Sequence, residues 1–225
     1  MGRCHFRPLF SRGPGLYDSE GAVCRSACRL LQAARKTLQR SDIRFGQGHD
    51  ALRKGKHPAS FPHLYRWEAS EWLARKIGYD VKSVLQVVAD YIRTGRIKLD
   101  PRRNSKTVTL HDPCQLVRMG GIVQEQRYIL EKAARHLVEM TPNREKNYCC
   151  GGGGGQLSMT GFASRRRSAG RIKAEQIERT KARVVASPCH NCLDQLAEIN
   201  KHYKLGVEVK SVIELAAEAL VPDRN

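Results

Sequence analysis

The chain of 225 residues carries a formal net charge of +18, with 40% hydrophobic and 28% charged residues, a composition typical of a globular protein. No apolar run approaches the ~18 residues of a membrane-spanning helix, and the basic start lacks the apolar stretch of a signal peptide. We therefore expect a cytoplasmic protein, in which eight cysteines fit metal or redox chemistry better than a disulfide framework.

The first part of the chain is basic and shows little hydrophobic periodicity. Residues 1–58 are interpreted as an irregular N-terminal extension with one helical stretch at 24–39. Amphipathic patterns predict helices at 70–77 and 83–94. Because the positive charge is spread along the chain, it fits either an acidic partner or a solvated basic surface.

A regular alternation of elements follows. Strands are predicted at 107–110, 136–140, 183–186 and 206–211. Helices are predicted at 122–137, 162–181, 191–203 and 212–220. Strands that alternate with helices predict an α/β fold built from parallel-sheet βα units, Rossmann-like in organisation.

Two segments of the chain resemble one another. DVKSVLQVVADYI at 80–92 is similar to EVKSVIELAAEAL at 208–220, which predicts two related halves. The first half is degenerate, because it lacks the cysteines of the second. We therefore predict an N-terminal extension over 1–58, a remnant of the first half over 59–100 and a cysteine-rich domain over 101–225.

Five cysteines follow three successive predicted strands. Cys114 comes after the first strand, Cys149 and Cys150 lie in the loop after the second, and Cys189 and Cys192 follow the third. Parallel strands end at a common edge of the sheet, so we expect the five sulfurs to meet there. Five thiols exceed the usual four ligands of zinc and of most iron–sulfur clusters, and the spacing leaves both open.

A run of glycines directly follows the paired cysteines. Gly151, Gly152 and Gly153 lack a Cβ, which would let the backbone approach a bulky anionic centre and donate N–H groups to sulfur. The alternative interpretation is a flexible linker. A phosphate-binding loop is disfavoured, because GGGGGQLS lacks the Gly-Lys-Ser/Thr ending of that motif.

Other polar residues near the cysteines are weaker candidates. His111 and His190 flank the predicted ligands and could protonate a leaving thiolate. The favoured alternative is a histidine hydrogen-bonded to backbone. Asp112 is predicted to cap its own turn, and the basic helix around 165–183 is interpreted as solvated, with docking of an acidic partner as the alternative.

The stretches LHDPC, NYCCGGGGGQLS and ASPCHNC resemble the cysteine-rich CCG domain family, which includes the B-type subunits of heterodisulfide reductase. The resemblance covers about residues 60–221. It is nearest to the K-type iron–sulfur subunit of sulfite-reductase-associated membrane electron-transfer complexes. It implies one cluster, a non-cubane [4Fe–4S] centre, with zinc as the alternative. The implied ligands are Cys114, Cys149, Cys150, Cys189 and Cys192.

The same resemblance implies an upstream ferredoxin-like domain with C-x-x-C-x-x-C runs. Cys4, Cys24 and Cys28 do not have that spacing, so electrons arriving through cubane clusters would come from another chain. The N-terminal stretch is therefore expected to be altered relative to the family.

The function implied by the resemblance is that of an iron–sulfur electron-transfer subunit, a heterodisulfide reductase-like oxidoreductase in sulfur metabolism. It would pass electrons to a disulfide or related sulfur acceptor, with other redox subunits as partners. Such partners would hold the chain in the cytoplasm or on the inner face of a membrane. The alternative is a structural zinc-binding or assembly module without redox activity. Binding to nucleic acid is disfavoured, because no reading motif is present and only 6% of residues are aromatic.

Overall fold

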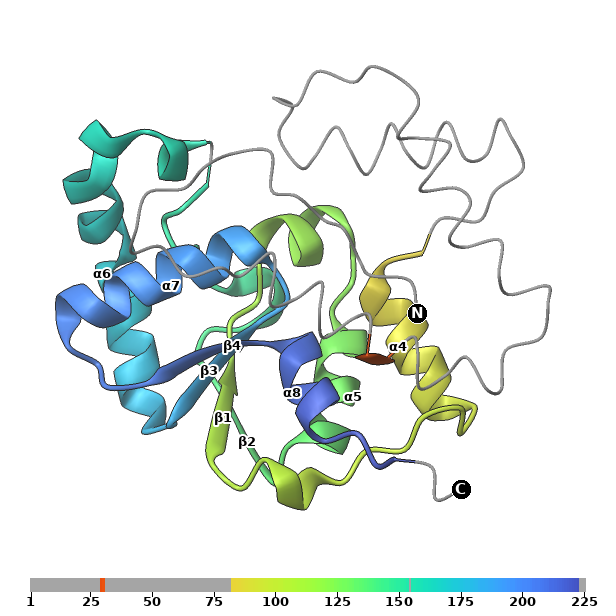
Figure 1. The fold of residues 1–225 in the computed structure, drawn as a ribbon. Coiled ribbons are helices and arrows are strands. Elements are labelled where there is room, and N and C mark those ends of the chain that lie inside the picture. The colour runs from red at the N-terminus through yellow and green to blue at the C-terminus, as the bar shows by residue number, and fades with distance from the viewer. Residues whose placement is uncertain (1–28, 31–81, 154, 223–225) are drawn as a thin grey trace, which may run out of the picture.

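A four-stranded, all-parallel sheet forms the centre of the fold, with strands in the order β2-β1-β3-β4. The computed structural model describes residues 29–30, 82–153 and 155–222. The strands are β1 (Thr107–Leu110), β2 (His136–Glu139), β3 (Val184–Ser187) and β4 (Glu208–Ser211). Helices cover both faces of the sheet (Figure 1). The predicted α/β fold with parallel βα units is confirmed.

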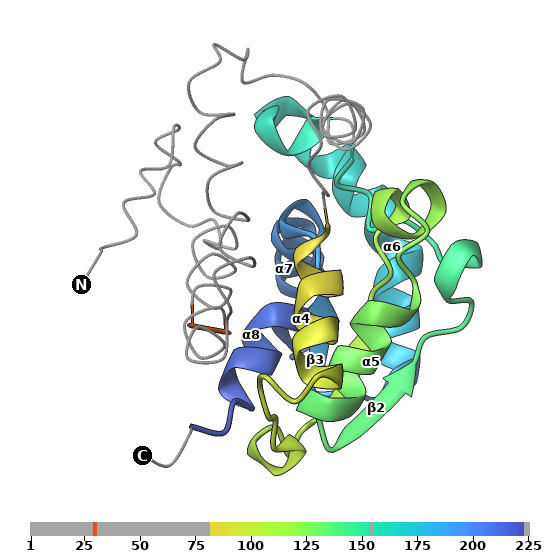
Figure 2. The same cartoon turned by 90° about the vertical axis from the view of Figure 1, so that its right-hand side faces the viewer.

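Three helices pack together on one face of the sheet (Figure 2). They are α4 (Val84–Arg93), α5 (Gln124–Ala133) and α8 (Val212–Glu218). Val108 and Leu110 of β1 and Val184 and Ala186 of β3 point into the core on this side, as the alternation of side chains along a strand requires. Leu30 is also buried in this core.

Two longer helices lie on the other face, α6 (Ala163–Thr180) and α7 (His190–Tyr203). A smaller core forms here, in which Val185 of β3 packs with apolar and sulfur-containing side chains. Its buried members are Met140, Cys150, Ile177, Val185, Cys192, Leu196 and Ile199. Two of the predicted site residues therefore belong to the packed interior rather than to a surface loop.

One predicted boundary is wrong. The helix predicted over 122–137 ends at Ala133, and β2 begins at His136. The buried side-chain amide of Asn104 donates to the carbonyls of Ala133 (2.8 Å) and Leu215 (2.9 Å). It thereby satisfies a carbonyl at the helix end that has no partner within the helix. The chain then turns extended at Ala134.

The similar segments at 80–92 and 208–220 begin helices in the same way. Ser83 caps α4 and Ser211 caps α8, and each forms a capping box with the residue three positions on, Gln86 or Glu214. This shared helix start accounts for the sequence similarity locally. The duplication itself stays a prediction. The proposed extension over 1–58 lies outside the described residues except for Arg29 and Leu30, which are helical.

The helix predicted at 70–77 and the cysteines Cys4, Cys24 and Cys28 also lie outside the described residues. In the described part of the chain, no helix has the length and apolar character needed to cross a bilayer.

Candidate metal centre

The five predicted cysteines all lie beyond the carboxyl ends of three strands. Cys114 follows β1 and precedes a single π-helical turn, η4 (Gln115–Met119). Cys189 directly precedes α7, and Cys192 lies in its first turn. Cys149 and Cys150 lie in the long loop between β2 and α6. Because parallel strands end at one edge of the sheet, these segments converge there.

The five thiols act on one another in a series. Cys114, Cys149 and Cys150 shift one another's pKa, and so do Cys189 and Cys192. The Sγ atoms of Cys150 and Cys192 lie 3.4 Å apart. Cys150 and Cys192 are buried, whereas Cys149 is exposed and Cys114 and Cys189 are half-buried. The structure thus places all five cysteines beyond neighbouring strand ends, and it shows a direct sulfur–sulfur contact between Cys150 and Cys192.

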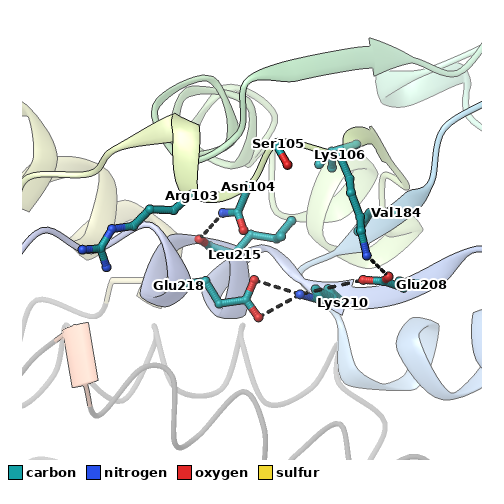
Figure 3. Close-up of a pocket in the computed structure, with 10 residues that line it drawn as sticks. Arg103, Asn104, Ser105, Lys106, Val184, Glu208, Lys210, Leu215 and Glu218 are labelled. Carbon is teal, nitrogen blue, oxygen red and sulfur yellow. Dashed lines mark hydrogen bonds and ion pairs between the residues drawn. The ribbon is translucent and has the colours of Figure 1, made fainter.

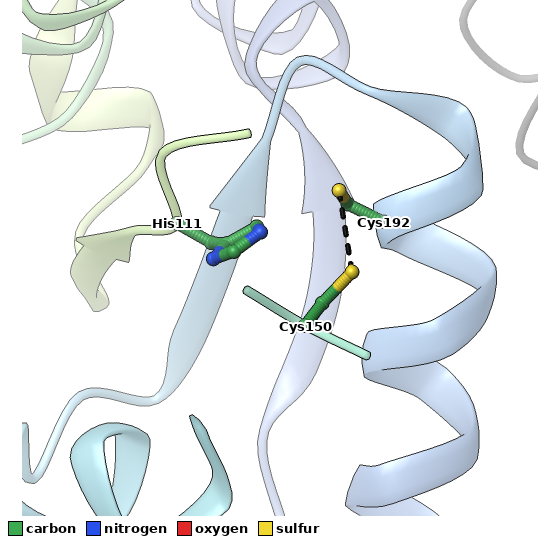
Figure 4. Close-up of side chains that lie close together, drawn as sticks. All are labelled: His111, Cys150 and Cys192. Atoms are coloured by element: carbon green, nitrogen blue, oxygen red, sulfur yellow. Dashed lines mark hydrogen bonds between the residues drawn. The ribbon is translucent and has the colours of Figure 1, made fainter. Parts of the chain in front are cut away.

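A histidine faces the two buried sulfurs. The His111 ring points toward Cys150 and Cys192 (Figure 4), and one ligand atom from each of the three residues lies within 4.8 Å of the others. Neither ring nitrogen of His111 has a hydrogen-bond partner among the described residues. The prediction of a histidine hydrogen-bonded to backbone is therefore wrong for His111. His190 is the first residue of α7.

The thiols perturb one another. Hydrogen bonds with the Cys114 and Cys150 thiols lower the pKa of Cys149, while the interaction with Cys149 raises the pKa of both Cys114 and Cys150. Contact with Cys150 raises the pKa of Cys192. A bound cation would stabilise all of the thiolates together, since metal ligation requires the deprotonated form.

The glycines after the paired cysteines differ in their surroundings. A Cβ on Gly152 would lie 2.7 Å from Gln195 Cβ, whereas a Cβ on Gly153 would meet nothing within 4 Å in the part of the chain that the structure describes. Gly151 has a φ of +88°, and its N–H donates to Cys149 Sγ at 3.4 Å. The predicted N–H donation to sulfur is thus present. At Gly152 the neighbour that the backbone approaches closely is helix α7 of the protein itself.

An arginine that the sequence reasoning missed joins two of the cysteine segments. Arg118 lies in the π-helical turn after Cys114, and its guanidinium donates to the carbonyls of Glu145 (2.8 Å) and Asn147. These carbonyls belong to the loop that leads into Cys149. No sequence signal predicts the π-helical turn, so nothing predicts the direction in which Arg118 points.

Asp112 is a buried carboxylate at the same edge of the sheet, and it binds groups from other elements. It is 1% exposed and forms an ion pair with Arg127 of α5, whose guanidinium also binds Glu139 at the end of β2. Its carboxylate further accepts from the Arg144 N–H at 2.7 Å. The prediction that Asp112 caps its own turn is wrong, because its oxygens bind groups 14 or more residues away.

The basic helix α6 is not solvated all round, contrary to prediction. Arg165 and Arg171 are exposed, but Lys173 is 0% exposed and Arg166 is buried. Arg166 pairs with Glu198 of α7 at 2.8 Å. The basic residues on this helix therefore divide between its solvent face and its packed face.

Comparison with known proteins gives the family of the part of the chain that contains this edge of the sheet. Residues 108–197 match the family described as the cysteine-rich domain, CCG. This part of the chain is a CCG cysteine-rich domain. The match begins in β1 and ends in α7, so it contains all five cysteines of the site.

Full-length relatives extend beyond this CCG domain. Over 150 residues the chain is 33% identical to the D-type subunit of the dihydromethanophenazine:CoB–CoM heterodisulfide reductase of Methanosarcina barkeri, an alignment that covers 66% of this chain and 36% of the relative. It is 32% identical to an Hdr-like menaquinol oxidoreductase iron-sulfur subunit of Archaeoglobus profundus, over 61% of this chain and 26% of that one. A probable iron-sulfur-binding oxidoreductase of Bacillus subtilis is 31% identical, over 71% and 23%. The matched region thus spans between 23% and 36% of these relatives.

The donors at this edge of the CCG domain fit a metal or cluster. Thiolate and imidazole are the ligands that zinc and iron–sulfur centres take. The buried thiols and the unpartnered His111 nitrogens offer such donors from three different segments of the chain.

A second hollow lies at the opposite edge of the sheet, around the starts of β1, β3 and β4 (Figure 3). Four of its charged lining groups already pair with one another: Lys106 binds Glu208, and Lys210 binds Glu218 at 2.8 Å. This hollow contains no thiol among the described residues that line it. The sulfur-rich edge is therefore the better candidate for chemistry.

Proposed function

We propose that the five cysteines hold one iron–sulfur cluster and that the chain is an electron-transfer component of a larger redox complex. The observation that carries this proposal is the placement of five cysteines beyond three neighbouring strand ends, with the buried sulfurs of Cys150 and Cys192 3.4 Å apart. Thiolates are the ligands of iron–sulfur clusters. The proposed ligands are Cys114, Cys149, Cys150, Cys189 and Cys192.

The names of the relatives support this proposal, because they include the D-type subunit of a heterodisulfide reductase and an iron-sulfur subunit of an Hdr-like oxidoreductase. The finer form of the proposal is a non-cubane [4Fe–4S] centre that serves a disulfide or related sulfur acceptor. When bound, such a centre supplies a one-electron carrier and iron that can hold a thiolate.

The buried and the exposed cysteines of this chain would have different roles. Cys150 and Cys192 are buried and would hold the centre away from water, while Cys149 is exposed and would face an approaching acceptor. Met119 and Tyr148 are exposed apolar side chains close in sequence to Cys114 and Cys149. We expect these two side chains to contact partner subunits. Those subunits would hold the chain in the cytoplasm or on the inner face of a membrane.

Anaerobic purification followed by iron and sulfide analysis and EPR tests the proposal. We expect several irons per chain and an EPR signal on oxidation or reduction. Cys150→Ser should lose most of the iron, whereas Cys4→Ser, outside the proposed ligand set, should retain it. A colourless protein with one zinc would exclude the redox function.

One observation favours a second candidate, a structural zinc module. His111, Cys150 and Cys192 place three ligand atoms within 4.8 Å of one another, and a zinc site of mixed imidazole and thiolate ligands needs only one more. This alternative predicts stoichiometric zinc that is lost in His111→Ala. In the cluster proposal, with five sulfur ligands, His111→Ala should keep its iron.

A further inference from the structure

Lys173 is a buried charge that the proposed ligand set does not use. It lies on α6 and is 0% exposed. Its Nζ donates to Gln176 Oε1 at 2.6 Å and lies 3.7 Å from Met140 Sδ. The Gln176 amide is itself fixed, because its Nε2 donates to the carbonyls of Thr141 and Pro142. The ammonium group is thus held in one place by a network anchored on backbone.

No carboxylate forms an ion pair with this ammonium within residues 82–153 and 155–222. Asp112 acts on Lys173 electrostatically, but its carboxylate is already paired with Arg127 at 2.8 Å. An ammonium that is removed from water without an anionic partner destabilises the folded protein. A lysine in such a place indicates that an anion nearby offsets this cost.

Lys173 contacts the buried core that contains two of the site's thiols. Met140, which Nζ contacts, packs in the same buried cluster as Cys150 and Cys192. Burial lowers the pKa of Lys173 to about 8, while the charges of Cys150, Asp112, Cys192 and Cys149 act in the opposite direction. A buried positive group therefore adjoins the core in which Cys150 and Cys192 are packed.

We propose that Lys173 is the countercation of the sulfur site, a positioning residue that stabilises the anionic centre that Cys150 and Cys192 would hold. This inference rests on the proposed function, because it needs a thiolate-bound metal or cluster. A divalent cation that binds several thiols gives a complex of net negative charge and releases protons. A fixed positive charge in a poorly screened interior favours that product.

Cobalt(II) titration of the reduced, metal-free full-length chain tests the inference. Thiolate–cobalt absorbance reports the ligands directly and needs no redox activity. Lys173→Met keeps the length of the side chain and removes its charge, so we expect the affinity to fall by about tenfold or more, the equivalent of one pKa unit. The matched control is Arg165→Met, which removes one exposed charge from the same helix. We expect it to change affinity by less than about twofold because of solvent screening.

Chemical denaturation of the metal-free variants separates a role toward the centre from a structural role. A countercation destabilises the metal-free fold, so Lys173→Met should unfold at the same denaturant concentration as the unmodified chain or a higher one. If the Lys173→Met variant binds cobalt as tightly as the unmodified chain, or is destabilised without metal, the inference fails while the proposed function stands. If the unmodified chain gives no thiolate–cobalt absorbance, both fail.

Discussion

At the scale of single residues, the glycines after Cys150 differ in how strictly each position requires glycine. Gly152 lies against Gln195 of α7, and Gly151 needs a positive φ, but a Cβ on Gly153 would meet no atom of the described residues within 4 Å. The sequence predicts that some of this run must be glycine because it abuts two cysteines. It cannot show which positions need glycine, because the helix that crowds Gly152 comes about 40 residues later.

Gly152→Ala should destabilise the protein by about 1–3 kcal/mol, since its Cβ would lie 2.7 Å from Gln195 Cβ and force a shift of backbone or helix. Gly153→Ala is the matched control, because no described atom lies within 4 Å of the added Cβ, and it should change stability by less than ~0.5 kcal/mol. Urea unfolding measures both. Equal effects of the two substitutions would contradict the close packing at Gly152.

At the scale of elements, the ion pair of Asp112 and Arg127 ties the end of β1 to α5, and Arg127 extends the link to β2 through Glu139. The order and type of these elements follow from the sequence, since strand and helix periodicities are local properties. The end of α5 and the role of Asp112 do not, because Asn104 and Arg127 act on them from distant positions in the chain.

Asp112→Ala should cost about 3–5 kcal/mol of unfolding free energy, because it leaves the buried Arg127 guanidinium, 4% exposed, without its main partner. Glu218→Gln breaks the more exposed pair with Lys210 and should cost ~0–1 kcal/mol. Guanidinium denaturation compares the two variants. If both variants unfold at the same denaturant concentration, the buried ion pair of Asp112 and Arg127 does not stabilise the fold as expected.

At the scale of the whole molecule, the placement of the cysteines beyond one edge of the sheet could be predicted because parallel strands share a carboxyl edge. Their ranking by burial could not be predicted, since it depends on how α6 and α7 cover that edge. Lys173 illustrates the same limit: it is one of many basic residues on α6, and only the packing of the helix distinguishes it.

Metal binding should stabilise the fold as a whole, because the proposed ligands come from three separate segments that unfolding would scatter. Zinc at about a thousandfold excess over its dissociation constant should add ~4 kcal/mol to the unfolding free energy. Cys150→Ser should lose most of this zinc-dependent gain. Its unfolding free energy without metal should stay close to that of the unmodified chain. Thermal unfolding with and without zinc is the measurement, and an unchanged midpoint in the unmodified chain would contradict the coupling.

The adjacent thiols at 149 and 150 differ in accessibility even though one peptide bond joins them, for the first is exposed and the second is buried. An electrophile such as iodoacetamide should therefore label the metal-free protein in a fixed order. The outer sulfur, whose pKa is lowered by its neighbours, would react first, and the inner one only when the loop opens. The rate of the second modification would then report how often the loop between β2 and α6 separates from α7.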